Sequence, residues 1–351
     1  MRSQESGVRD RESEAKIPES GIWNPESGIW KEGTPLLKIQ GLCKDFASGI
    51  LRKKRVRVID SVDMEVRAGE IRGIVGESGS GKTTLARCSV RLIEPSAGRV
   101  QFDGQDLAFL SPAALRAKRK EFQMIFQDSF ASLNPGMTVG QVLSEPLKIH
   151  NVGTGDFRDG RIGELLESVS LSTSLIHRKS SDLSGGQQQR LGIARGLALK
   201  PRLLIADEPV SALDPSVQAQ ILNLLGDLKR QQDLTLIIIS HSLHAVHYLC
   251  THVSVLYKGR LVEEAPAPSF FRGPKHPYSR ILLESMPVLE PLKKNRASSA
   301  PTMDPSSAST LSGCAFFAHC PQRLPLCREN VPLLSELYPR EKVACFLYEQ
   351  K

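Results

Sequence analysis

Long apolar runs are missing from this sequence of 351 residues. A helix that crosses a bilayer needs roughly 18 to 20 apolar residues, and the run 234–239, one of the longest here, falls far short of that length. The N-terminus is polar and charged, and it lacks the apolar segment of a secretory signal peptide. We therefore expect a cytoplasmic protein that other chains must hold if it works at a membrane.

Concentrated positive charge is also scarce, although 46 Lys and Arg against 38 Asp and Glu leave a net charge of +8. The one dense basic run, 52–57, is short and contains no aromatic residue. Surfaces that bind nucleic acid usually combine a longer basic stripe with stacking aromatics, so we expect no nucleic-acid partner. In a cytoplasmic chain the seven cysteines should be reduced, and a cluster of them would indicate metal and not disulfides.

The composition, 40% hydrophobic and 24% charged, is that of a globular protein with a sizeable core. Residues 1–33 carry a short tandem repeat with both tryptophans, and we expect a disordered leader there. Residues 34–265 form the main domain, with a helical subdomain at about 112–185. Residues 266–351 form an extension, in which a Pro- and Ser-rich linker at about 290–312 precedes a tail with four cysteines.

The main domain alternates apolar segments with helical patterns. Apolar runs at 203–206 and 234–240 predict two buried strands, separated by a helix that begins at Asp214 and Pro215. Buried strands that alternate with helices indicate an α/β fold with a parallel sheet covered on both faces. A hairpin at 253–264 should close this unit.

Residues 76–83, with the sequence GESGSGKT, match the phosphate-binding loop G-x-x-x-x-G-K-[ST]. They lie between an apolar strand, 71–75, and a helix that starts near Lys82, which is the context that the motif requires. The glycines let backbone N–H groups converge on phosphate oxygens, and the helix N-terminus adds positive potential. Lys82 can supply a charge to the β- and γ-phosphates, and the Thr83 hydroxyl can bind magnesium.

The strand at 203–207 ends in two carboxylates, Asp207 and Glu208. A charged strand end is common by itself. Beside a phosphate loop, Asp207 can hold the hydration shell of magnesium and Glu208 can polarise an attacking water. The pair therefore predicts phosphoryl transfer to water from a bound nucleotide.

The sequence LSGGQ at 183–187 stands immediately before a helix. With Gln127, Asp214 and His241, it makes residues 36–265 resemble the ATP-binding-cassette (ABC) ATPases, whose elements occur here in the family's order. The resemblance implies a P-loop NTPase (RecA-like) core with an antiparallel β subdomain, a helical subdomain and a small C-terminal extension. A GTPase is disfavoured because no Asn-Lys-x-Asp guanine motif is present.

The resemblance implies the ATP-binding residues, position by position. They are Phe46, Gly76, Glu77, Ser78, Gly79, Ser80, Gly81, Lys82, Thr83 and Thr84. Phe46 would stack on the adenine, although a core aromatic at a strand edge is the alternative. A second set would bind the ATP of an opposite subunit: Ser184, Gly185, Gly186, Gln187 and Asp214. Asp214 fits the role of a helix cap equally well.

The resemblance also implies the catalytic groups. Glu208 would be the general base, with His241 holding the γ-phosphate and the attacking water. Gln127 would reach Mg²⁺ from a loop that also touches the transport partner, so we expect a partner-binding groove near it. The implied Mg²⁺ ligands are Thr83, Gln127 and Asp207. Two subunits would close over two ATP molecules and open after hydrolysis.

Within the ABC family, the chain is similar to ATPase subunits of the bacterial dipeptide/oligopeptide importers, a group that includes nickel importers. The resemblance is carried by residues 76–84, 123–128, 131–135, 145–147 and His-Pro-Tyr at 276–278. Glu-Pro-Leu at 145–147 favours the F-type member of the usual ATPase pair. Peptide import is the implied function, and import of nickel or another solute is the alternative. A soluble ABC protein acting on ribosomes or DNA is a further, weaker hypothesis.

The importer resemblance implies a set of partners. They are a second, paralogous ATPase subunit, two transmembrane permease subunits and, indirectly, an external solute-binding protein. The chain would lie on the cytoplasmic face of the inner membrane, held there by the permeases.

The tail cysteines form a further candidate site. They are Cys314, Cys320, Cys327 and Cys345. Four thiolates close together suit zinc or an iron–sulfur cluster, and the absence of a short C-x₂-C knuckle favours the cluster. The alternative is a small reduced subdomain with incidental thiols.

Overall fold

The computed structural model describes residues 22–24, 29–31, 35–48, 54–127, 132–211, 213–286 and 313–349. The chain separates into two compact units, Met1–Thr34 and Pro35–Lys351. In the first unit, β1 (Ile22–Asn24) and β2 (Ile29–Lys31) pair in antiparallel fashion. Each copy of the tandem repeat therefore contributes one strand. The rest of the predicted leader and the predicted linker lie outside the described residues, so disorder there stays a prediction.

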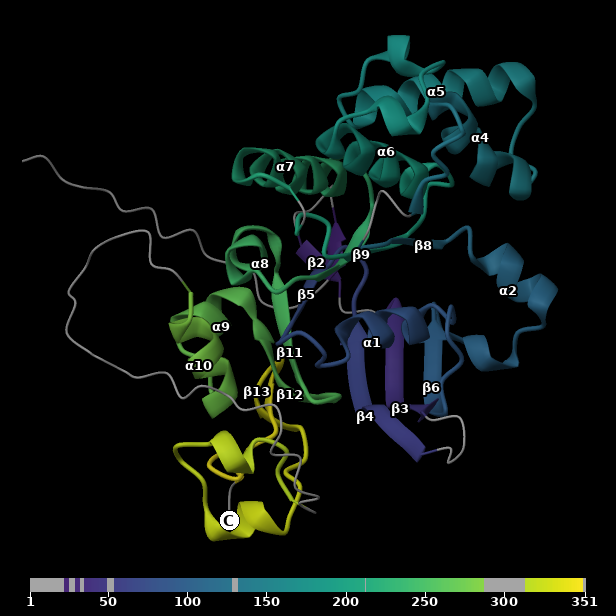
Figure 1. The fold of residues 1–351 in the computed structure, drawn as a ribbon. Helices are drawn as coiled ribbons and strands as arrows, with labels where there is room; N and C mark the ends of the chain where they lie inside the picture. The colour runs from purple at the N-terminus through teal and green to yellow at the C-terminus, as the bar shows by residue number, and fades with distance from the viewer. Residues whose placement is uncertain are drawn as a thin grey trace, which may run out of the picture. The chain divides into compact units, whose positions relative to one another are not determined.

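An eight-stranded sheet forms the base of the second unit, in the order β13-β14-β12-β11-β5-β10-β9-β8 (Figure 1). The five strands from β11 to β8 pair in parallel, and the other three are antiparallel. The strands are β5 (Ile71–Val75), β8 (Phe122–Ile125), β9 (Leu203–Asp207), β10 (Thr235–Ile239), β11 (His252–Tyr257), β12 (Arg260–Pro266), β13 (Ser335–Tyr338) and β14 (Glu341–Val343). Every residue of β5, β9 and β10 is buried, which confirms the predicted buried strands. The antiparallel pairing of β11 with β12 confirms the predicted hairpin.

A second, antiparallel sheet has the order β4-β3-β6-β7. Its strands are β3 (Leu37–Ser48), β4 (Lys54–Val66), β6 (Ala97–Phe102) and β7 (Gln105–Asp106). One hydrophobic cluster joins this sheet to the main sheet, with Phe102 packed edge-on against Phe122 of β8. The expected antiparallel subdomain is therefore present, and it packs beside α1 (Lys82–Ser89), the helix that follows the phosphate loop.

Helices cover the main sheet, and a second hydrophobic cluster lies beneath them. At one end of the unit α4 (Val139–Ile149), α5 (Gly155–Ser168) and α6 (Gly185–Leu197) pack on one another (Figure 1). The other helices are α2 (Pro112–Lys118), α7 (Pro215–Gln231), α8 (Leu243–Leu249), α9 (Ala267–Arg272) and α10 (Pro277–Glu284). Short 3-10 turns occur at Leu107–Phe109, Thr173–Leu175, Ser180–Asp182, Phe317–His319 and Pro325–Arg328. In the part of the chain that is described, no helix has the length and hydropathy needed to cross a bilayer.

The predicted helical subdomain needs one correction. Its range, about 112–185, contains β8, which pairs in parallel with β9 and therefore belongs to the main sheet. The strand is only four residues long, Phe-Gln-Met-Ile, and so short an apolar run does not distinguish a strand from a helix by periodicity. Its pairing with β9 decides the matter.

The C-terminal tail is part of the main sheet. The sequence predicted that the β11–β12 hairpin would close the unit, but β14 pairs with β12, placing Val343 opposite Glu263. Arg340 of this tail donates to the Glu70 carboxylate at 2.8 Å. The same carboxylate accepts from Arg72 at 2.6 Å, and Arg72 also donates to Glu264 at 3.0 Å. A buried ion network therefore ties β5, β12 and the tail together.

Arg72 is the centre of this network, so Arg72→Leu should destabilise the fold strongly. The substitution leaves the buried Glu70 and Glu264 carboxylates without their main partner, which should cost about 3–5 kcal/mol of unfolding free energy. Urea denaturation of the full chain measures this. The control is Arg57→Leu, which removes an exposed pair with Asp45 and should change the denaturation midpoint little. Equal effects of the two variants would contradict the prediction.

Candidate functional site

The phosphate loop connects the buried strand β5 to α1, and its glycines are required by its geometry. Gly76 has φ +151°, and a Cβ there would lie 2.2 Å from the Leu256 carbonyl oxygen. Gly81 has φ +105° at the N-cap of α1, and a Cβ there would lie 2.9 Å from the Val58 carbonyl oxygen. Neither position accepts a side chain, so the loop can only follow this path with glycine.

Lys82 is buried within the loop that it follows. Its Nζ donates to the carbonyl oxygens of Gly76 and Glu77, both at 2.8 Å. Burial lowers the pKa of Lys82, while Glu208, Asp207 and Glu77 act in the opposite direction. Lys82 also lines the cavity next to the loop, so phosphate oxygens of a bound nucleotide could replace the two carbonyls as partners of its ammonium group.

Asp207 and Thr83, two of the three predicted Mg²⁺ ligands, are in contact, while the third, Gln127, donates to Glu208. The Thr83 hydroxyl donates to Asp207 Oδ1 at 3.0 Å. Asp207 is fully buried, burial raises its pKa, and its Oδ2 has no hydrogen-bond partner among the described residues. A buried carboxylate oxygen without a partner, next to a hydroxyl, is a donor set that suits Mg²⁺. The two residues therefore fit the ion, which would neutralise phosphate charge.

Glu208 lies where the catalytic groups converge. Its carboxylate accepts from Gln127 Nε2 at 2.9 Å and lies 3.4 Å from His241 Nδ1. Its backbone has φ +47°, an uncommon conformation for a residue with a side chain, which turns the chain sharply after β9. The structure thus brings together the three residues that the sequence predicted to be catalytic.

A cavity of about 210 Å³ holds most of the predicted ATP site. Its lining contains Val58, Ser78, Gly79, Gly81, Lys82, Thr83, Thr84, Gln127 and Glu208. Val58, on β4, was not predicted, and no motif marks it. Gly76, Glu77 and Ser80 belong to the loop but do not line this cavity. The Glu77 backbone N–H donates to the Tyr278 hydroxyl at 2.9 Å.

Phe46 does not line this cavity. It lies on β3 with 38% of its surface exposed, and Lys44 Nζ is 5.0 Å from the ring centroid. The core alternative for Phe46 is therefore wrong, because its ring faces solvent. An exposed ring is available for stacking on a base, so the adenine role stays a prediction.

The predicted trans-binding residues also lie outside the cavity. Ser184 is the N-cap of α6, where its hydroxyl accepts from the Gln187 N–H at 3.4 Å and Gln187 Oε1 accepts from the Ser184 N–H at 3.0 Å. This capping box holds Gly185 and Gly186 in the first turn. Asp214 occupies the N-cap of α7, but its side chain makes no capping hydrogen bond. The capping role predicted for the Asp214 side chain is thus absent.

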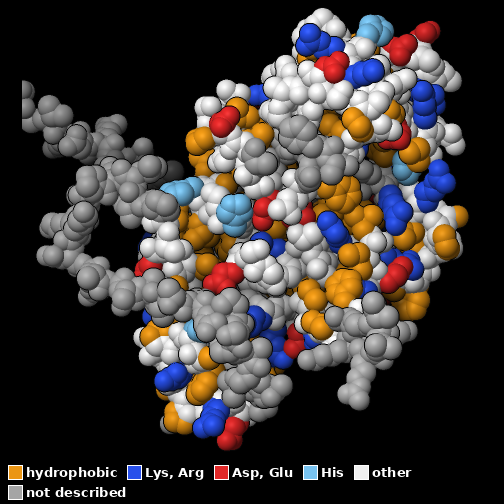
Figure 2. All heavy atoms as spheres, viewed as in Figure 1, with side chains coloured by type: hydrophobic (Ala, Val, Ile, Leu, Met, Phe, Trp, Pro, Cys, Tyr) orange, Lys and Arg blue, Asp and Glu red, His pale blue; other side chains and the backbone are white. Residues whose placement is uncertain are grey.

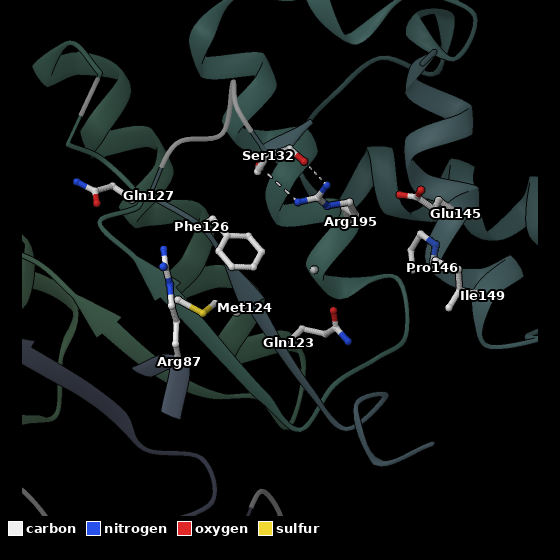
Figure 3. Close-up of a pocket in the computed structure, with 11 residues that line it drawn as sticks. Arg87, Gln123, Met124, Phe126, Gln127, Ser132, Glu145, Pro146, Ile149 and Arg195 are labelled. Atoms are coloured by element: carbon white, nitrogen blue, oxygen red, sulfur yellow. Dashed lines mark hydrogen bonds between the residues drawn. The ribbon is translucent and has the colours of Figure 1, made fainter. Parts of the chain in front are cut away.

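A larger hollow of about 590 Å³ adjoins the ATP cavity (Figures 2 and 3). Its walls come from α1, β8, α4 and α6, and they contain Arg87, Gln123, Met124, Phe126, Gln127, Ser132, Glu145, Pro146, Ile149, Arg195 and Gly196. Met124 and Phe126 face Pro146 and Ile149 across the hollow in Figure 3. A hollow thus lies near Gln127, where a groove was expected, and its partner-binding role stays a prediction. Seven of its residues lie in the segments 123–128, 131–135 and 145–147 that carried the importer resemblance, but sequence could not show that they converge because they come from separate elements.

The tail cysteines do not support the predicted iron–sulfur or zinc site. All four line one cavity, but its volume is about 10 Å³, roughly that of one water molecule. Among the described residues, no group of three His, Cys, Asp or Glu side chains is arranged to hold a metal ion. Burial raises the pKa of Cys314 and Cys320, and that of Cys345 to about 11. All four are free thiols, as in the alternative weighed from the sequence, a small reduced subdomain with incidental thiols.

Comparison with known proteins agrees with this geometry. The ABC transporter family matches residues 59–211, and the family described as the C-terminal region of oligopeptide/dipeptide transporters matches residues 262–327. A putative peptide import ATP-binding protein of Brucella ovis is 45% identical over 312 residues, which cover 89% of this chain and 98% of that protein. This chain belongs to the ABC transporter ATP-binding proteins. It is an ATPase that uses ATP and Mg²⁺, as members of this family do.

Further relatives and solved structures fit the same assignment. The oligopeptide transport ATP-binding protein AppF of Bacillus subtilis is 42% identical over 321 residues, 89% of this chain and 97% of AppF. The dimeric ATP-binding cassette MJ0796, bound to ADP and Pi, superposes with a TM-score of 0.60 at 28% identity, covering 66% of this chain and 98% of that one. CbiO1 of Clostridium perfringens gives 0.61 at 26% identity, covering 68% and 92%. These structures confirm the predicted fold class.

The position of Glu208 in this ABC ATPase leads to a direct test. Glu208→Gln keeps the size of the side chain but removes its basicity, so hydrolysis should fall by about 10²–10⁴-fold while ATP still binds. Phosphate release and nucleotide binding of the purified variant measure the two effects. The control is Glu167→Gln, an exposed position on α5. Unchanged turnover in Glu208→Gln would show that another group is the base.

Proposed function

We propose that this ABC ATPase energises the import of di- and oligopeptides, as the F-type member of a pair of ATPase subunits. The relatives named for peptide import cover nearly the whole of this chain, and the C-terminal family match covers residues 262–327. The similarity to AppF and the Glu145-Pro146-Leu147 sequence support the F-type assignment. Import of nickel or another solute by the same engine is the alternative.

The observation that carries this proposal is the position of Gln127. Its side chain lines both the ATP cavity and the larger hollow, and its Nε2 donates to Glu208 at 2.9 Å. A partner that enters the hollow therefore touches the residue that contacts the catalytic carboxylate. Through Gln127, movement of a permease segment in the hollow would shift the contact to Glu208, and ATP binding or hydrolysis would in turn move the permease segment.

The chemistry of the hollow suits a short helix or loop from a permease subunit. Met124, Phe126, Pro146 and Ile149 offer apolar surface. Arg87 lines the same space and adds positive charge to it. A docking segment with apolar side chains and a carboxylate would complement these walls.

The proposed assembly contains two ATPase subunits, two transmembrane permeases and an external solute-binding protein that supplies the solute. Each ATP would lie between the phosphate loop of one subunit and the residues 184–187 and 214 of the other. The exposed position of Ser184 and Asp214, outside their own subunit's cavity, supports sharing across a dimer. The ATPase would lie on the cytoplasmic face of the membrane. Residues 34–265 would form its nucleotide-binding domain, and the C-terminal region would be joined to it through the sheet.

Solute specificity can be measured as ATP turnover of the complex isolated with its permeases, with and without a loaded binding protein. Di- or oligopeptides on the binding protein should stimulate ATP turnover, because the permeases would transmit the presence of solute to the ATPase through a conformational change. The control is the unloaded binding protein. If a nickel chelate stimulated turnover and no peptide did, the assignment as an ATPase would stand, and nickel would take the place of peptides as the proposed solute.

The shared site predicts that Ser184→Arg blocks hydrolysis although Ser184 lies outside its own ATP cavity. When both ATPase subunits carry the change at this position, turnover should fall by about 100-fold or more, because a large side chain replaces the contact to the γ-phosphate. ATP binding to the isolated chain should persist. Ser181→Arg, at an exposed position nearby, serves as the control. Normal turnover in the doubly substituted complex would contradict the shared site.

A further inference from the structure

Tyr278, in the first turn of α10, reaches the phosphate loop from the C-terminal region. Its side chain is fully buried, and its hydroxyl accepts a hydrogen bond from the Glu77 N–H at 2.9 Å. The two residues are 201 positions apart in the chain. A buried tyrosine hydroxyl needs a polar partner, and this one has found it in the backbone of the loop.

The bond acts on one particular peptide unit. The Gly76–Glu77 peptide donates its N–H to Tyr278, and its carbonyl oxygen accepts from Lys82 Nζ at 2.8 Å. The peptide plane is therefore held from both ends. Gly76 has no Cβ to restrict its backbone, so without these two hydrogen bonds the peptide plane could rotate. Of the two, the bond to the Tyr278 hydroxyl does not depend on the position of Lys82. If phosphate oxygens were to draw Lys82 away, the Tyr278 hydroxyl would still hold the plane.

Tyr278 is itself held firmly. The Glu263 carboxylate on β12 accepts from the backbone N–H groups of Lys275 and His276, at 2.7 and 2.9 Å, which fixes the start of α10. His276 Nδ1 then accepts from the Tyr278 N–H at 3.0 Å. These three bonds leave the first turn of α10 little freedom to move away from the loop.

The cysteine-containing tail supports the tyrosine ring from the other side. Phe316 is almost fully buried, and its centroid lies 5.5 Å from that of Tyr278. Tyr257 of β11 completes the cluster, 4.5 Å from Tyr278 and 5.2 Å from Phe316. The tail is therefore linked to the phosphate loop through this cluster of three tilted or edge-on aromatic rings.

We propose that Tyr278 is a positioning residue for ATP: its hydroxyl holds the Gly76–Glu77 peptide in the orientation that accepts phosphate, and Phe316 keeps the ring in place. The loop is thereby ordered before the nucleotide arrives, which lowers the entropic cost of binding. The role given to the tail is to support the phosphate loop. This inference rests on the assignment of residues 76–84 to the phosphates of ATP.

Tyr278→Phe keeps the ring and removes the hydroxyl. We expect the Kd of the full-length chain for a non-hydrolysable MgATP analogue to rise about 5–10-fold, since the Glu77 N–H loses its acceptor. In the complex, KM for ATP should rise similarly while kcat changes less than about twofold. Amide hydrogen exchange in residues 76–81 should become faster, with the melting temperature nearly unchanged. Phe316→Leu should weaken binding in the same direction.

Tyr348→Phe is the matched control, because the Tyr348 hydroxyl bonds to Arg280 of the same helix and to the Lys275 carbonyl, but not to the loop. It should leave nucleotide binding and exchange at 76–81 unchanged. Wild-type binding and exchange in Tyr278→Phe, or equal effects in Tyr348→Phe, would overturn the positioning role. Lys82→Ala tests the underlying assignment separately: if it leaves nucleotide binding intact, the loop does not hold the phosphates and the inference fails with it.

Discussion

Parallel pairing of β5 and β9 with β10 between them is the constraint on which the site depends. Since parallel strands end at the same edge of a sheet, the phosphate loop after β5, the carboxylates at the end of β9 and His241 after β10 meet there. The Thr83–Asp207 bond of 3.0 Å and the Glu208–His241 distance of 3.4 Å follow from this edge. This pairing brings three segments that are far apart in the chain to one edge of the sheet.

The site is polar where a stable core would be apolar. Asp207 is fully buried, and its Oδ2 has no hydrogen-bond partner among the described residues, while Glu208 has a left-handed backbone. Both features cost stability in the free protein, and a bound Mg²⁺ would satisfy the first. The fully buried strands on either side supply the rigidity that maintains these features.

Two side chains reach the ATP site from elements other than β5, β9 and β10. Gln127 approaches from the groove beside α4 and α6, and it contacts the catalytic carboxylate. Tyr278 approaches from α10 and contacts the backbone of the loop. In the proposed assembly, the first contact responds to the permease, and the second prepares the loop for the nucleotide. The ATP site is thus supported by a mobile partner and by a fixed part of the same chain.

The sequence by itself determined the motifs, the buried strands and the family, and it named the candidate catalytic residues, because these depend on local spacing and on unbroken apolar runs. It could not place β8, whose four residues carry no clear period, nor show that the tail extends the sheet through β14, since strand pairing is a long-range event. For the tail cysteines the sequence left a metal site and a reduced subdomain as alternatives, and among the described residues no group of three metal-ligating side chains is arranged around an ion. The groove and the Tyr278–Glu77 bond join residues far apart in the chain, so only tertiary packing could decide them.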